Sequence, residues 1–144
     1  MLRIDYMPRL RVDYMQPGGL IWNDEGRENM PKNALLFYSE ELASQCELLC
    51  KSIKGNANAV SQLRRSSSSV LANVSEGQYP HSLSDMLFKF RIARKECVET
   101  ESWLKLLYNT HLIDEPCFKA MRNLAGRVER LITASCLTIE KKPK

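Results

Sequence analysis

Residues 62–107 constrain the fold of this chain most strongly, because they hold two amphipathic helical patterns separated by a short break. In each pattern apolar residues recur at steps of three and four, which is the spacing of one face of an α-helix. Gly77 and Pro80 mark the break, since a proline lacks the amide hydrogen that a continuing helix needs. Two amphipathic helices joined so closely favour packing against each other in opposite directions.

Four segments of the chain share this periodicity, at about 33–53, 57–77, 82–109 and from 114 onward. Ser82 or Ser84 can cap the third segment, and Asp114 precedes the fourth. No alternation of β-branched residues in 31–144 indicates a sheet. A chain of 144 residues with 44% apolar residues can bury a core. The sequence therefore predicts an all-α, antiparallel up-down four-helix bundle over residues 31–144.

Residues 1–30 differ from the rest of the chain. They contain two near-copies of one short unit, Arg3–Met7 and Arg11–Met15, followed by the sequence Pro17-Gly18-Gly19. Neither a helical stripe nor a sustained strand alternation emerges, so we expect a poorly ordered arm. Met30 directly precedes the first helical segment, and translation starting at this residue is a second expectation.

Several features of the sequence indicate the cellular compartment of the protein. No apolar run approaches the ~18 residues of a transmembrane helix, and the first residues do not resemble a signal peptide. Scattered thiols in odd number are typical of a reducing compartment. The five cysteines are Cys46, Cys50, Cys97, Cys117 and Cys136. We therefore expect a cytoplasmic protein that does not contact a membrane.

A polar stripe runs beside the apolar stripe on each of the two central segments. Its members are Gln62, Ser66, Ser69, Asn73, Glu76, Glu96 and Glu99. Small serines let helices approach closely, while asparagine and glutamate can bridge backbones or pair with Arg65. We expect an interhelical polar seam; an exposed groove that binds a partner is the alternative.

The sequence predicts no catalytic, cofactor or metal site. Glu76, Glu96 and Glu99 could suggest a di-metal carboxylate centre, but such bundles use Glu-x-x-His motifs, and neither His81 nor His111 fits one. A Gly-x-Ser-x-Gly turn and a glycine-rich phosphate loop are both absent from the sequence. We therefore expect a protein that is not an enzyme and that needs no cofactor.

The positive charge is uneven along the chain. Residues 1–30 carry −1, and the remainder carries +5. Lysines and arginines neutralise phosphates and release counterions, which gives salt-dependent and sequence-tolerant binding of nucleic acid. The residues expected to contact phosphate are Arg64, Arg65, Arg91, Arg94 and Lys95. A solvated face whose cations pair with neighbouring carboxylates is the alternative.

The 82–109 segment also carries a second apolar set, offset from the first. It consists of Phe88, Ile92, Trp103 and Leu106. A single bundle normally needs one apolar face on each helix, so we expect the second face to contact another copy of the chain.

The two central segments match the residue pattern of a known family. In the first of them the matching positions are Gln62, Leu63, Arg65, Ser66, Ser69, Val70, Ala72, Asn73, Val74 and Glu76. In the second they are Ser82, Asp85, Ile92, Ala93, Lys95, Glu96, Glu99, Thr100, Trp103, Leu104, Leu106 and Leu107. Over about residues 33–140 the chain thus resembles the four-helix bundle proteins associated with intervening sequences in bacterial 23S rRNA genes. It departs from them at 77–81, where the family has a more glycine-rich loop, and at Phe88–Phe90.

This resemblance implies a homopentameric, barrel-like ring of antiparallel bundles without known catalytic activity. Nucleic-acid binding is proposed for the family. The function we expect is therefore low-specificity binding of nucleic acid, RNA in particular, by a homo-oligomer. The alternative is a protein–protein interaction scaffold or adaptor without a nucleic-acid role.

Overall fold

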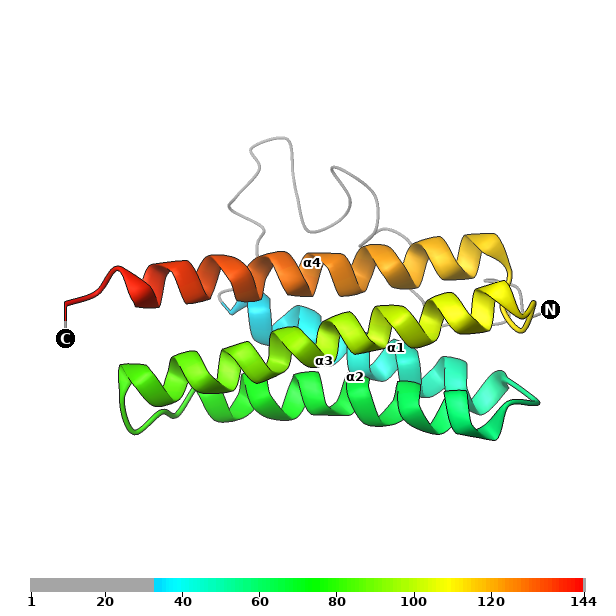
Figure 1. The fold of residues 1–144 in the computed structure, drawn as a ribbon, viewed down its shortest axis with the longest axis horizontal. Coiled ribbons are helices and arrows are strands. Elements are labelled where there is room, and N and C mark those ends of the chain that lie inside the picture. Colours follow the sequence, from blue (N-terminus) through cyan, green and yellow to red (C-terminus); the bar gives the residue numbers. More distant parts are fainter. Residues whose placement is uncertain (1–32, 144) are drawn as a thin grey trace.

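Four helices lie side by side along the long axis of the molecule in this computed structural model, which describes residues 33–143 (Figure 1). They are α1 (Ala34–Ser52), α2 (Ala57–Gly77), α3 (Leu83–Asn109) and α4 (Glu115–Glu140). Packing joins α1 to α2, α2 to α3, α3 to α4 and α4 back to α1. The prediction of an all-α fold with four helices is confirmed, and residues 33–143 contain no strand. The predicted arm, residues 1–30, lies outside the described residues.

Every helix begins at a polar side chain that accepts a hydrogen bond from a backbone amide of the first turn. The caps are Asn33, Asn56, Ser82 and Asp114, with donor–acceptor distances of 3.1, 3.0, 3.0 and 2.9 Å. A helix start leaves amides without an intrahelical partner, and such caps satisfy one of them. Ser82 rather than Ser84 caps α3. These local signals explain why the predicted helix bounds lie so near the observed ones.

The inward faces of all four helices form one core. Its largest fully buried side chains are Tyr38, Leu42, Leu49, Leu63, Leu104, Leu107, Ile113, Met121, Leu124, Ile132, Val70 and Val74. Tyr38 keeps its polar end satisfied, because its hydroxyl accepts a hydrogen bond from Arg127 Nη1 at 2.9 Å. The guanidinium carbon of Arg127 also lies 5.0 Å from the centre of the tyrosine ring, which joins α1 to α4.

Helices α2 and α3 approach each other through small side chains of α2. In the middle of the contact, the Thr100 hydroxyl donates to Ser66 Oγ at 2.9 Å, and both residues are fully buried. At the end of α2, Gly77 leaves room for the ring of Phe90, which is 3% exposed. A Cβ atom at position 77 would lie 2.8 Å from Cδ1 of Phe90 and closer still to Cε1. The close packing of α2 against α3 therefore requires glycine at position 77.

The cysteines are free thiols, and all five are buried. Burial disfavours the thiolate and raises the pKa of each, to about 11 for Cys50 and about 12 for Cys117. The nucleophilic form of cysteine is the thiolate. These side chains therefore act as apolar core residues near neutral pH.

We predict that Gly77→Ala destabilises the bundle by about 1–3 kcal/mol, because the added methyl group forces the buried Phe90 ring to move. Gly126→Ala is the matched control, since the nearest atom there is the flexible end of Arg130 at 3.2 Å. The control should gain about 0.5–1 kcal/mol, as alanine is the better helix former. Chemical denaturation of both variants measures the difference, and equal stabilities would contradict the close packing.

Stability should also fall as pH rises above about 9. An unfolded thiol loses its proton near the ordinary pKa of 9.0, whereas Cys50 in the folded protein holds its proton up to about 11. Above pH 9 the unfolded state therefore binds fewer protons, and the free energy of unfolding decreases with pH. Denaturation at pH 8, 9.5 and 11 tests this, and Cys50→Ala should show a shallower decline. Identical slopes for the two proteins would refute the role of Cys50.

Candidate nucleic-acid interface

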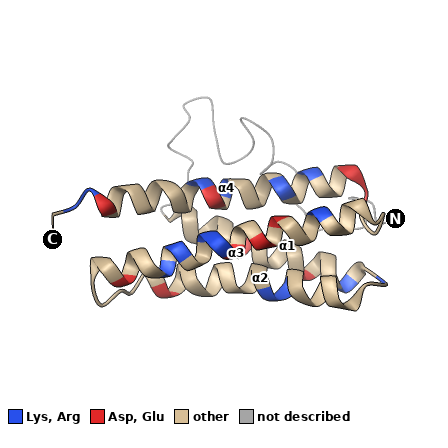
Figure 2. Ribbon diagram, viewed as in Figure 1, with Lys and Arg blue, Asp and Glu red and all other residues tan. Residues whose placement is uncertain are grey.

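The five residues predicted to contact phosphate all lie on the outer surface of α2 and α3, where lysines and arginines are interspersed with carboxylates (Figure 2). Arg64 Nε lies 2.7 Å from Glu47 of α1. On the other side of α2, Arg65 reaches Glu99 at 2.5 Å and Glu96 at 3.3 Å, both on α3. Arg64 and Arg65 thus link α2 to two different neighbours, and their charges are compensated.

The pKa values of these groups follow from the pairing. Hydrogen bonds to carboxylates raise the pKa of Arg64 and of Arg65. The hydrogen bond from Arg65 also lowers the pKa of Glu99, with a further contribution from Trp103 Nε1, which donates to the same carboxylate at 3.2 Å. Glu99 therefore stays ionised near neutral pH and is unsuited to donate a proton as a general acid.

The other three predicted cations lie together on α3. Arg91 is paired with Glu140 of α4 at 2.9 Å. Arg94 and Lys95 are exposed, and neither forms an ion pair with any residue between 33 and 143. These two side chains supply uncompensated positive charge on the outward face of the helix.

The three cations surround a shallow hollow of about 560 Å³. Phe88, Ile92 and Val98 complete its lining. Phe88 is 60% exposed and Val98 47% exposed, so apolar surface and positive charge occur side by side. The sequence pattern predicts Phe88 and Ile92 as surface contacts but not Val98, which belongs to neither apolar set of the helix.

The predicted apolar interface follows most of the length of α3. Phe88 and Leu106 are exposed, whereas Ile92 and Trp103 are half-buried. Trp103 also packs against the core. The hollow contains the first two members of this set, and the other two lie near the opposite end of the helix.

The predicted polar seam is interhelical only in part. Ser66 bonds to Thr100, as described above, Glu96 and Glu99 pair with Arg65, and Glu76 pairs with Lys89 of α3 at 2.7 Å. The other three members form their hydrogen bonds within α2. Asn73 Nδ2 donates to the Ser69 carbonyl at 2.9 Å, and Gln62 Oε1 accepts from Arg65 at 3.2 Å.

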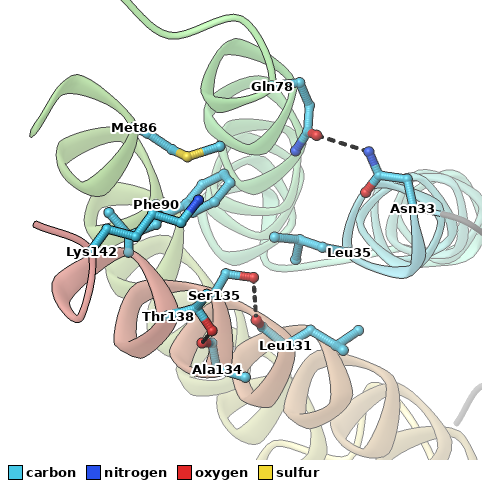
Figure 3. A pocket seen from close by; sticks show the side chains of 11 residues that line it. Asn33, Leu35, Gln78, Met86, Phe90, Leu131, Ala134, Ser135, Thr138 and Lys142 are labelled. Atoms are coloured by element: carbon cyan, nitrogen blue, oxygen red, sulfur yellow. Dashed lines mark hydrogen bonds between the residues drawn. The ribbon is translucent and has the colours of Figure 1, made fainter. Parts of the chain in front are cut away.

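A second hollow, of about 390 Å³, opens at the end of the bundle where α1 begins (Figure 3). Its polar side chains bond to protein groups: Asn33 Nδ2 donates to Gln78 Oε1 at 2.8 Å, and the Ser135 hydroxyl donates to a backbone carbonyl of its own helix at 2.9 Å. Among residues 33–143, Lys142 is the one charged residue of its lining. The described part of the lining therefore lacks the pair of titratable groups that acid–base catalysis uses.

Two further findings apply to residues 33–143. They contain no group of three or more histidine, cysteine, aspartate or glutamate residues placed to hold a metal ion. None of the four helices has the length and apolar character needed to cross a membrane.

Comparisons with known proteins agree with the resemblance seen in the sequence. A family model described as 23S rRNA-intervening sequence protein matches residues 36–134. The chain is also similar to the crystal structure of a protein of unknown function from the S23 ribosomal protein family of Bacteroides thetaiotaomicron. Sequence identity is 29% and the TM-score 0.68, and the match covers 71% of this chain and 97% of that chain. A search of curated proteins gave no match. Because the family model extends from α1 into α4, the chain belongs to the 23S rRNA-intervening sequence protein family.

Proposed function

We propose that this protein is a non-enzymatic, homo-oligomeric bundle that binds RNA with low sequence specificity in the cytoplasm. The proposal depends on two neighbouring cations of α3 that form no ion pair within residues 33–143, Arg94 and Lys95, which lie beside Arg91. Exposed cations attract the phosphate backbone, and contacts to phosphate carry no sequence information by themselves. Arg64 and Arg65 are secondary contacts in this proposal, because their carboxylate partners already satisfy them.

The proposed assembly is a homopentameric ring of antiparallel, up-down bundles. Successive helices are separated only by residues 53–56, 78–82 and 110–114. Connections this short favour antiparallel neighbours. The ring of five is the expectation from the family resemblance. Repeating one cationic surface around a ring increases avidity for a long polyanion, because each further contact becomes intramolecular.

The proposed contact between copies uses the part of the second apolar set near the end of α3, Trp103 and Leu106. Leu106 is 36% exposed, and the half-buried Trp103 lies beside it on the same side of the helix. Burying these side chains against a neighbour removes apolar surface from water. Phe88 and Ile92, the other members of the set, line the hollow nearer the start of the helix and are not needed for this contact.

We predict that the double substitution Arg94→Ala and Lys95→Ala weakens RNA binding and its salt dependence. Loss of two phosphate contacts should reduce the slope of log K against log salt by about 1.5. The matched control is Lys51→Ala with Lys54→Ala, which removes the same net charge near the end of α1. Filter binding of labelled RNA between 50 and 200 mM salt measures both slopes.

Equal effects of the two double variants would show that net charge, and not this surface, controls binding. Retention of no RNA by the unmodified protein at low salt would end the proposed function.

For the assembly, we predict that Leu106→Lys gives smaller particles in light scattering, because a charge would have to be buried at the contact. Leu137→Lys is the control, since Leu137 is 52% exposed on α4 and outside the proposed contact. Smaller particles from the control alone would place the contact between copies on α4.

The alternative function is a protein–protein interaction scaffold or adaptor. Exposed apolar side chains such as Phe88, Val98 and Leu137 favour it, because such surface often binds another protein. Purification from native cells separates the two functions. Associated material that is removed by nuclease supports RNA binding, and a stoichiometric protein that resists nuclease supports the scaffold.

A further inference from the structure

We infer that the hollow on α3 binds a single-stranded segment of nucleic acid and that one unpaired base stacks on Phe88. This inference rests on the proposed function and goes beyond it, since it names the strand state and the residue that selects it. Three observations support it: the ring of Phe88 is exposed, cations lie around this ring, and the hollow has the length of a few nucleotides.

Phe88 has an unusual environment for an aromatic residue of a helix. Its ring is 60% exposed, although core positions of α3 such as Phe90 lie only two residues away. Arg91 and Ile92 follow one helical turn later, and Lys95 follows one turn after that, on the same side of the helix. All four line the hollow of about 560 Å³. One accessible ring face is therefore bordered by positive charge.

This combination fits a nucleotide better than a second copy of the chain. A nucleotide brings a flat aromatic ring and a negative charge together, and single-strand binding proteins meet them with aromatic side chains in cationic grooves. A second copy seated on the hollow would have to desolvate Arg94 and Lys95, which form no ion pair within residues 33–143. Burying unpaired charge is costly, so charge complementarity favours the polyanion.

The exposed ring of Phe88 also favours single-stranded over double-stranded nucleic acid. In a duplex the bases stack on each other and their faces are closed to a protein side chain, whereas an unpaired base can stack on an aromatic ring. From Phe88 to Lys95 the helix rises ~10 Å, the axial length of about three nucleotides of one strand. The site thus suits a short single-stranded stretch, with phosphates beside Arg94 and Lys95 and one base on Phe88.

The test compares Phe88→Leu with Phe88→Tyr in the full chain. Leucine keeps an apolar side chain but removes the aromatic face, and tyrosine keeps the face. The probes are a labelled 12-nucleotide RNA of mixed sequence without self-complementarity and the duplex of the same RNA with its complement. Fluorescence anisotropy at fixed salt gives both affinities, and light scattering of the same samples gives particle size.

We expect Phe88→Leu to weaken single-strand binding about tenfold, because one base–aromatic stack is lost. The affinity for the duplex and the salt slope should stay unchanged, since the phosphate contacts remain. Phe88→Tyr should bind the single strand like the unmodified protein.

Each other outcome overturns the inference in a distinguishable way. If Phe88→Leu binds the single strand as tightly as the unmodified protein does, the stacking role is wrong, while RNA binding itself stands. Smaller particles for Phe88→Leu would instead assign Phe88 to the contact between copies. If neither RNA form binds the unmodified protein at low salt, the proposed function fails together with this inference.

Discussion

The close packing of α2 on α3 is the constraint on which the surface chemistry of this bundle depends. Ser66 and Gly77 permit the approach, and the buried hydrogen bond from Thr100 to Ser66 fixes the relative position of the two helices. That register places Arg65 of α2 beside two glutamates of α3 and places Lys89 of α3 beside Glu76 of α2. Charges along this boundary are thus neutralised in pairs, whereas Arg94 and Lys95 of α3 form no ion pair within residues 33–143.

Ion pairs on such exposed surfaces contribute little to stability, since water and salt screen them. Their larger effect here is to determine which cations remain available to a ligand. Arg64 and Arg65 are held by carboxylates of two different helices, whereas Arg94 and Lys95 are not held by any carboxylate of residues 33–143. Helix α3, which contributes Phe90, Leu104 and Leu107 to the core, therefore also presents these two cations next to the exposed ring of Phe88.

Much of the fold could be predicted from the sequence, because helix caps and apolar periodicity are local signals. Asn56, Ser82 and Asp114 each precede a periodic segment and cap it. The state of the charged site could not be predicted in the same way. Whether a cation is free depends on contacts between distant residues, such as Arg91 with Glu140, which are 49 positions apart. Those contacts depend on helix register and rotation, for which the sequence has no local signal. The packing of Phe90 against Gly77 could not be predicted from the sequence for the same reason, since it also depends on helix register.

The two roles assigned to α3 are compatible because the helix is long. Phe88 and Leu106 are separated by ~27 Å along its axis at 1.5 Å per residue. A contact between copies near Trp103 and Leu106 can therefore leave the Phe88 end of the hollow open.

In the proposed function, each hollow offers few free cations and would release few counterions, so one bundle alone would bind RNA weakly at physiological salt. Only repetition of the hollow on a shared assembly turns such a surface into a useful one, since a strand held by one copy meets the next at high effective concentration. In the proposed function, α3 therefore supplies both the contact between copies and the surface that binds RNA.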